Sequence, residues 1–277
     1  MKAVVANEPL IRLCLSLATF AIMALWEAAR PKRKRPVPRA RRWPGNLGVL
    51  LVDTVTARII APTSAVGFAI IAENHGSGLF NTVKLPAWIP FLLCLLLLDF
   101  GIYLQHRLFH YVPLLWRLHR MHHADLDLDL TSGVRFHPLE ILLSLGIKFG
   151  VIVLLGPPAV AVLVFEAALN SSSIFNHGNV RISPGVDRWL RLLVVTPDMH
   201  RVHHSILRRE TDSNFGFNFP WWDRFFGTYR AQPEAGQDGV TIGIEQFRDP
   251  KELRLGRMLL QPFRRGDHHT SDRKVLK

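Results

Sequence analysis

Long apolar stretches alternate with short polar connections over the first hundred residues of the chain. Three of these stretches, residues 10–29, 47–72 and 85–104, contain few charged positions. Each approaches the roughly 20 residues that an α-helix needs to cross the hydrocarbon core of a bilayer. The pattern predicts an integral membrane protein with about three spans, which form an N-terminal membrane region over residues 1–104.

A fourth apolar region, residues 139–175, is interrupted near its middle. Gly156, Pro157 and Pro158 stand there, and proline cannot continue the hydrogen-bond ladder of a regular helix. We expect a helical hairpin of two half-helices in the membrane, because the other stretches already commit the chain to lipid. Taken alone, the region could also be a pair of core helices in a soluble protein. The predicted fold class is all-α.

The distribution of basic residues predicts how the chain is oriented. The run PKRKRPVPRARR, residues 31–42, directly follows the first stretch, which lacks the small-residue cleavage pattern of a removed signal peptide. The positive-inside rule places this run in the cytoplasm. The N-terminus and residues 73–84 are then expected outside, and everything from His106 onward inside. The basic C-terminal half agrees with this orientation.

Charge and cysteine content exclude several classes of function. The net charge of +12 comes from residues beside the apolar stretches and near the C-terminus, without a nucleic-acid-binding motif around them. We therefore expect anionic lipid headgroups as partners and no nucleic acid. The only cysteines, Cys14 and Cys94, lie inside apolar stretches, which excludes a disulfide framework and a thiolate metal site.

Eight of the thirteen histidines fall into three short motifs with helical spacing. They are HRLFH at 106–110, HRMHH at 119–123 and HRVHH at 200–204. Residues at i, i+3 and i+4 of a helix project to one side, so each motif offers two or three imidazoles to one point. Imidazole suits iron, zinc, copper and nickel. Because eight to ten such ligands are too many for one ion, the motifs predict two metal ions.

The other residues narrow the kind of metal site. The scarcity of cysteine excludes an iron–sulfur centre. A carboxylate-bridged site is disfavoured because the sequence has no dense cluster of Asp and Glu residues. A histidine-rich binuclear iron site remains. A membrane metal-binding or transport protein is the main alternative, although transporters place ligands near the bilayer midplane. A zinc-dependent hydrolase would need a general base, as in His-Glu-x-x-His, and the chain has no such motif.

With these motifs in this order, the chain resembles the fatty acid hydroxylase superfamily, which includes sterol desaturases, C-4 methylsterol oxidases and alkylglycerol monooxygenase. The apolar hairpin between the second and third motifs and the trailing run NFGFNFPWWDRFFGTY, residues 214–229, complete the resemblance over about residues 95–230. It implies a catalytic region at 105–230, followed by a polar tail at 231–277. The complete set of motifs argues against a non-catalytic scaffold.

The resemblance also implies the metal ligands. It assigns iron to the eight motif histidines, His106, His110, His119, His122, His123, His200, His203 and His204. It adds His177, in NHGNV, where the family places an extra histidine between the second and third motifs. His137, in RFHPLE, fits some family members as a further ligand. The alternative for His137 is a structural histidine that donates to a backbone carbonyl.

The implied activity is O₂-dependent hydroxylation or desaturation of a sterol, fatty acyl or ether lipid by a membrane monooxygenase with two iron ions. Electrons would come from a reductase, ferredoxin or cytochrome, because the chain has neither a dinucleotide fingerprint nor cysteines for a cluster. One sequence cannot separate hydroxylation from desaturation, which begin with the same hydrogen abstraction. The C-terminal Lys-Val-Leu-Lys is no organelle retrieval signal, so we expect a bacterial inner membrane with cytoplasmic histidines.

Several polar neighbours of the motifs are candidates for orienting the imidazoles. Asp99 lies seven residues before His106 on the same helical stripe, so we predict that its carboxylate contacts a ligand ring; pairing with a neighbouring helix is the alternative. The same two roles, orienting a ring or capping a helix, are open for Glu140, Asn176, Asn179 and Asp198. We expect residues 214–229 to form a membrane-surface element or a lid, with Trp221, Trp222 and Phe225 at the substrate entrance or in an aromatic belt.

Overall fold

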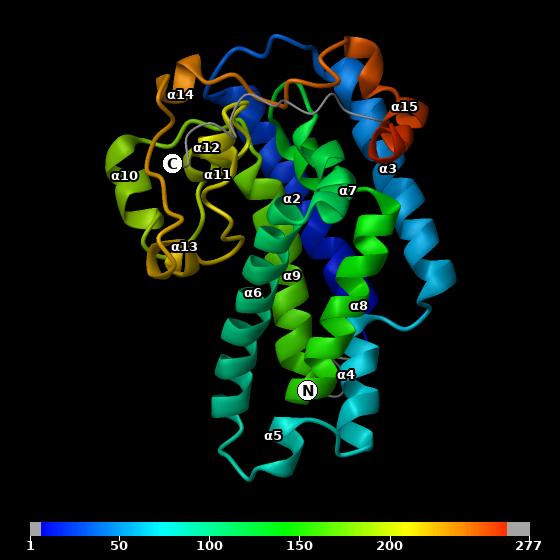
Figure 1. Cartoon of the computed structure of the whole chain (residues 1–277). Helices are drawn as coiled ribbons and strands as arrows, with labels where there is room; N and C mark the ends of the chain where they lie inside the picture. Colours follow the sequence, from blue (N-terminus) through cyan, green and yellow to red (C-terminus); the bar gives the residue numbers. More distant parts are fainter. Residues whose placement is uncertain (1–6, 265–277) are drawn as a thin grey trace, which may run out of the picture.

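The computed structural model describes residues 7–264, and every regular element within them is helical (Figure 1). The predicted all-α class is confirmed. The longer helices are α2 (Glu8–Ala29), α3 (Arg39–Ile60), α4 (Ala65–Asn74), α6 (Trp88–Tyr111), α7 (Pro113–His123), α8 (Pro138–Leu155) and α9 (Ala159–Asn176). The short ones are α5 (Leu79–Thr82), η1 (Leu130–Val134), α10 (Pro184–Leu190), α11 (Pro197–His203), α12 (Arg208–Thr211), α13 (Trp221–Phe225), α14 (Gly236–Gly239), η2 (Pro250–Leu253), α15 (Leu255–Leu260) and η3 (Gln261–Phe263).

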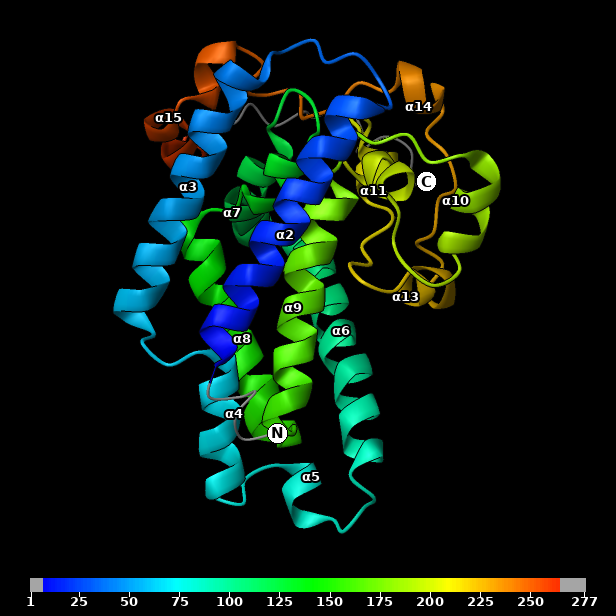
Figure 2. The same cartoon turned by 180° about the vertical axis from the view of Figure 1, so that it is seen from behind.

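Five helical stretches in the described residues are long and apolar enough to cross a membrane. They are residues 8–29, 39–82, 88–111, 138–155 and 159–176, which correspond to the three predicted spans and the two arms of the hairpin. In both views α9 lies in the middle of the bundle, where it contacts α2, α4 and α6 (Figure 1, Figure 2). Large apolar side chains cover the outside of the bundle, as expected of surfaces that face lipid.

Glu166 of α9 is a buried carboxylate inside the bundle, and it is paired with two basic side chains. The carboxylate of Glu166 on α9 accepts a hydrogen bond from Lys148 on α8, at 2.5 Å, and forms an ion pair with Arg12 on α2, at 3.1 Å. An unpaired charge at this depth would be costly. The pairs therefore tie three helices together around an otherwise apolar core.

The predicted hairpin is present, but its arms are longer than half-helices. α8 and α9 each contain 18 residues and run the length of the bundle. Gly156 ends α8 with φ 62°, a left-handed conformation that glycine adopts without strain. A Cβ atom at Gly156 would also stand only 2.5 Å from the carbonyl oxygen of Ser77. The turn of the hairpin thus lies against the loop that precedes α5.

The second predicted span, residues 47–72, consists of two helices. α3 ends at Ile60, and α4 begins at Ala65 behind Pro62 and the N-cap residue Ser64, whose hydroxyl accepts from the Gly67 N–H at 3.0 Å. Proline and an N-cap serine both favour a new helix start at this point. A hydropathy pattern does not reveal such a break, because all the residues around it are apolar or small.

A polar cap lies at the end of the bundle where α6 ends and α8 begins, and it consists of α7, η1 and the elements from α10 onward (Figure 1). The basic residues 31–42 lie at this same end. The described part of the segment predicted as a polar tail, residues 231–264, is folded onto the cap: Met258 of α15 packs against Val49 and Met121 in the interior. Residues 265–277, the rest of that segment, lie outside the described residues.

Candidate metal centre

The nine histidines predicted from the motifs and from His177 converge from four helices. α6 carries His106 and His110 in its last two turns, α7 carries the second motif, and α11 the third. His177 is the C-terminal cap residue of α9. All nine side chains are buried. Their helical spacing therefore directs them into the interior, where the cap meets the bundle.

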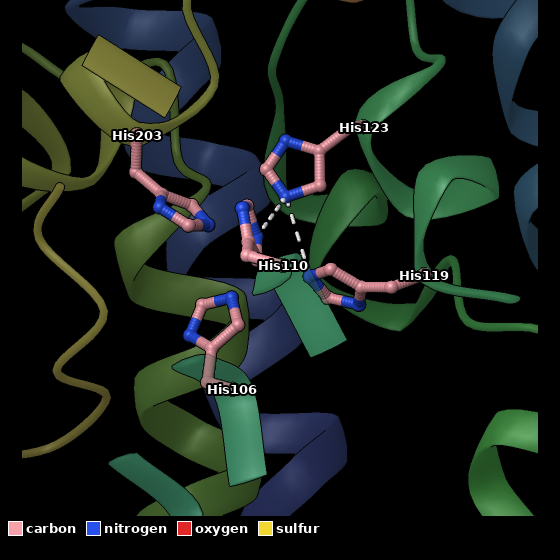
Figure 3. A group of neighbouring side chains, drawn as sticks. All are labelled: His106, His110, His119, His123 and His203. Atoms are coloured by element: carbon pink, nitrogen blue, oxygen red, sulfur yellow. Dashed lines mark hydrogen bonds between the residues drawn. The ribbon is translucent and has the colours of Figure 1, made fainter. Parts of the chain in front are cut away.

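The nine side chains form two groups. The first contains His106, His110, His119, His123 and His203, and the second contains His122, His177, His200 and His204. Within each group the candidate ligand atoms lie within 4.8 Å of one another. Figure 3 shows the five rings of the first group directed toward a common centre. The motifs on α7 and α11 contribute to both groups, whereas the motif on α6 contributes to the first group alone.

Hydrogen bonds at the rear nitrogen, Nδ1, orient six of the nine rings. Backbone carbonyls accept from four of them: Phe215 from His106 at 2.8 Å, Arg135 from His122 at 3.2 Å, Ser173 from His177 at 2.7 Å, and Ser213 from His203 at 2.7 Å. Carboxylates accept from two: Asp212 from His110 at 3.2 Å and Glu140 from His119 at 2.6 Å. Since these oxygens only accept, the proton is on Nδ1, and Nε2 carries a lone pair.

The Nε2 atoms lie at distances typical of ligands that share an ion. Nitrogens bound at about 2.1 Å and about 90–100° apart would be separated by about 3.0–3.2 Å. In the second group His177 Nε2 lies 3.0 Å from His122 and His200 and 3.1 Å from His204. In the first, His123 Nε2 lies 3.1 Å from His110 and 3.2 Å from His119 (dashed in Figure 3).

Two opposed lone pairs this close repel each other unless a cation lies between them. His122 and His177 form such a pair, because both rings donate through Nδ1. The Nε2 atoms of His106 and His203 are buried without a protein partner. An orphaned buried acceptor is expensive, and a metal ion would satisfy all of them. The donor set of each group therefore fits one metal ion.

Comparison with known proteins identifies the family of this arrangement. Residues 91–228, which include all three motifs, match the fatty acid hydroxylase family. The chain belongs to the fatty acid hydroxylase superfamily. The predicted resemblance is confirmed.

Fatty acid hydroxylase relatives include hydroxylases, monooxygenases and desaturases of lipids. An ornithine lipid hydroxylase from Rhizobium tropici is 29% identical over 82% of this chain and 69% of that protein. Human alkylglycerol monooxygenase is 32% identical over 54% of this chain, but the match spans only 32% of the human protein. A Delta(7)-sterol 5(6)-desaturase from Aspergillus fumigatus is 27% identical over 72% of this chain and 69% of its own length. No solved structure matches the chain.

The protonation state of the grouped histidines suits metal binding. Burial, together with the neighbouring imidazoles, lowers the pKa of His122, His123, His200 and His204 well below the ordinary value of 6.5. Burial lowers the pKa of His177 to about 4 and that of His203 to about 3. These rings are neutral at pH 7, the form in which imidazole binds a metal.

Asp99 does not contact a ligand imidazole, so its predicted role is wrong. Its carboxylate accepts from the backbone N–H of Asn218 and Phe219, at 3.3 and 3.4 Å, from the Asn218 amide at 2.8 Å, and from the indole of Trp222 at 2.8 Å. Asp99 thus joins α6 to the aromatic segment 214–229. Asp99 therefore holds the segment whose backbone carbonyl at Phe215 orients His106.

His137 lies outside both groups. It is the N-cap residue of α8, where its Nδ1 accepts from the Leu139 N–H at 3.2 Å, and its Nε2 lies 3.2 Å from the carbonyl oxygen of Leu259. Both ring nitrogens are therefore engaged by the backbone. The structure supports the structural alternative for His137 and not the ligand role, because its position before α8 turns the ring toward α15.

The other polar candidates divide between the two roles. Glu140 orients His119, as one of its predicted roles required. Asn176 donates to the Phe217 carbonyl, and Asn179 exchanges hydrogen bonds with the backbone of Arg33. Asp198 pairs with Lys32 and Arg201. These three side chains connect segments and do not contact the rings.

Sequence reasoning missed Asp212, the carboxylate behind His110. It stands eight residues after the last histidine of the third motif, in the turn that follows α12. No periodicity relates this turn to α6. A polar residue in a loop gives no signal of its own, since most such residues are solvated.

Proposed function

We propose that this protein is a membrane-bound, O₂-dependent di-iron oxygenase that hydroxylates a lipid with electrons from an external donor. The supporting observation is the pair of buried histidine groups, with Nε2 atoms 3.0–3.2 Å apart and neutral rings. Iron combines affinity for imidazole with oxygen chemistry, and it is the metal that the resemblance to the family implies. The names of the relatives favour hydroxylation over desaturation and a lipid as substrate.

Each group would hold one iron ion, with five ligands from the first group and four from the second. Bound iron would supply the oxidising chemistry needed at an unactivated C–H bond. The chain's own residues orient the ligands through Nδ1 and exclude water. Phe136 stacks on His122 with ring centroids 4.4 Å apart, and Phe215 and Trp116 lie against His110 at 5.1 and 5.0 Å. These aromatic rings make a dry surrounding for a reactive site.

The proposed partners and location follow from the same features. A reductase, ferredoxin or cytochrome would deliver the electrons. The basic run lies at the histidine end of the bundle, where Lys32 pairs with Asp198 at 2.8 Å, so the proposed site is cytoplasmic, in a bacterial inner membrane. A cysteine placed at exposed Asp238 should react with a membrane-impermeant maleimide only after the cells are lysed. Labelling in intact cells would reverse the orientation.

The decisive experiment measures the metal and the reaction together. Protein purified in mild detergent from iron-supplemented cells should contain about two irons per chain, given two groups of four or five ligands, and Mössbauer spectra should show magnetic coupling. Lipid mass spectrometry with and without the gene should reveal an added oxygen atom. Zinc without iron, even after iron reconstitution, would contradict the oxygenase and favour a metal-binding protein.

Single substitutions test the ligand assignment. His119→Ala and His203→Ala should abolish lipid oxidation and lower the iron content, while membrane insertion is retained. His137→Asn is the matched control, because His137 is a buried histidine outside both groups and asparagine can also cap α8. Its iron content and activity should stay near those of the parent. Turnover in either alanine variant would overturn the assignment.

A further inference from the structure

An apolar surface lies outside the candidate spans, on α10, residues 191–193 and α13. We call it the lobe surface. Its exposed side chains are Val186, Trp189, Leu192, Leu193, Trp221, Phe225 and Phe226. Phe225 is 80% exposed, Trp189 65% and Leu193 61%. Soluble surfaces rarely expose so many large apolar groups in one place, and such a patch marks an interaction site.

Hydrogen bonds hold the two parts of the lobe surface together. The indole of Trp221 donates to the Leu192 carbonyl at 2.7 Å, and the guanidinium of Arg224 donates to the Arg191 carbonyl at 2.9 Å. The chain around α10 therefore lies directly beside α13. The apolar side chains form one continuous surface and are not scattered.

The lobe surface lies at the depth of a membrane span. The rings of Trp222 and Phe226 lie against Phe100, with centroids 4.8 and 5.7 Å apart, and Phe226 also lies 5.5 Å from Tyr103. At 1.5 Å per residue, Phe100 and Tyr103 are about 16 and 12 Å from the end of α6 at Tyr111. Figure 1 shows α13 beside the middle of α6. A bilayer that surrounds α6 would therefore also surround α13.

Charge favours a lipid headgroup region over a protein partner. The exposed charged residues of α10 and α13 are Arg188 and Arg224, while Asp187 and Asp223 are buried. Arg188 lies over the Trp189 ring at 5.5 Å. Tryptophan beside arginine is typical of the interfacial layer, where arginine reaches anionic phosphates. Leu104 and Leu108, which follow Phe100 and Tyr103 along α6, are also exposed and face lipid if α6 spans the membrane.

We propose that the lobe surface inserts into the leaflet at the histidine end of the bundle, with Arg188 and Arg224 bound to anionic phospholipid headgroups. Interfacial elements of this kind bury their apolar face about 5–10 Å into the boundary between headgroups and acyl chains. The segment between α10 and α13 contains the third histidine motif. Insertion would thus attach this half of the metal centre to the membrane, whatever reaction the centre performs.

Nitroxide labels test the insertion independently of any activity. Cys14 and Cys94 are replaced by alanine, and a single cysteine is then introduced at position 189 or 225. Trp189 and Phe225 are exposed, so their replacement should not disturb the fold. A cysteine at the position of exposed Asp238 on α14 is the control. The protein is placed in lipid nanodiscs. Labels at 189 and 225 should collide with oxygen several-fold more, and with a water-soluble nickel complex several-fold less, than the label at 238. Equal nickel access at 225 and 238 would overturn the proposal and leave the surface to a protein partner or a second copy.

Lipid composition tests the arginines. In nanodiscs that contain phosphatidylglycerol, the label at 225 should lie deeper than in discs of phosphatidylcholine alone. The double variant Arg188→Ala/Arg224→Ala should lose this difference, and Arg181→Ala, an exposed arginine outside the lobe surface, should retain it. The same depth in both lipids for the parent protein would overturn the binding of anionic headgroups.

Discussion

Protein oxygens fix the hydrogen position on six of the nine grouped histidine rings, and they do so in two different ways. Four rings donate to backbone carbonyls, which no side-chain substitution removes. Two donate to carboxylates: His119 to Glu140, which is buried, and His110 to Asp212, which also accepts from Arg208. Partners behind a ligand set its tautomer and raise its basicity. Glu140 is therefore the point where this support can be removed cleanly.

Replacing Glu140 by leucine should weaken iron binding at the first group. The substitution leaves His119 Nδ1 without its acceptor at 2.6 Å, and losses of such partners typically reduce metal affinity or activity about 10- to 100-fold. Glu140→Gln keeps an oxygen that can accept, so its loss should be smaller. Competition with an iron chelator measures the affinity. Identical affinity in the leucine variant and the parent would show that the carboxylate does not support the ligand.

At the scale of elements, Arg42 of α3 holds the segment that follows the second histidine motif. Its guanidinium donates to both carboxylate oxygens of Asp125 at 2.8 Å and to Asp129 at 2.7 Å, and all three side chains are fully buried. Burial alone would raise the pKa of Asp125, but the guanidinium lowers it below its ordinary value. This segment leads to Arg135, whose carbonyl orients His122. The basic run therefore helps to build the candidate metal centre.

Arg42→Met should destabilise the protein strongly. It leaves two buried carboxylates without their cation, and breaking a buried pair by removing one partner costs about 3–5 kcal/mol. The expected result is a large decrease in the midpoint of thermal unfolding in detergent. Arg41→Met is the matched control, because Arg41 is the exposed neighbour on the same helix, and its midpoint should stay close to that of the parent. Equal midpoints for the two variants would contradict the role of Arg42.

The same contacts explain what the sequence could and could not predict. Spacing within a motif was enough for the histidines, because residues on one helix face stay together in any fold. Asp99 shares the helix of His106, but its partners at Asn218 and Trp222 are 119 and 123 residues away. Periodicity predicts the face of a helix and not what packs against it. For the same reason, the sequence indicates only that Arg42 belongs to the basic run that orients the chain in the membrane, and not that it binds Asp125 and Asp129.

At the scale of the molecule, a lipid-facing bundle carries a polar cap (Figure 2), and the candidate metal centre lies where they meet. Some of the basic residues at this end form ion pairs within the protein. Arg35 and Arg39 pair with Glu27, at 3.3 and 2.8 Å, and Lys32 pairs with Asp198. The basic residues that can bind anionic lipid headgroups are therefore mainly the exposed ones, such as Arg41. Hydropathy and charge predicted this division into two parts, and only the tertiary contacts identify the basic residues that remain for lipid.

The buried histidines make the stability of the metal-free protein depend on pH. His177 has a pKa of about 4 and His203 one of about 3 in the folded state, whereas histidine in an unfolded chain titrates near about 6.5. Below pH 6.5 the unfolded state therefore binds protons that the folded state does not. The free energy of unfolding is therefore highest above this pH. It decreases as the pH falls toward 4, by about 1.4 kcal/mol per pH unit for each such histidine.

Thermal unfolding in detergent checks this dependence. It is measured from pH 7.5 down to about pH 4.5, a range that crosses the ordinary pKa of histidine. The metal-free midpoint should decrease steeply below pH 6.5. Iron-loaded protein should keep its midpoint to lower pH, because a ligand that binds only the folded state stabilises it until protons displace it. His75→Ala should leave the metal-free curve unchanged, since His75 is exposed. A midpoint that stays flat from pH 6.5 to 5 would mean that the rings take up protons within the fold, which is incompatible with the dry, neutral groups that metal binding requires.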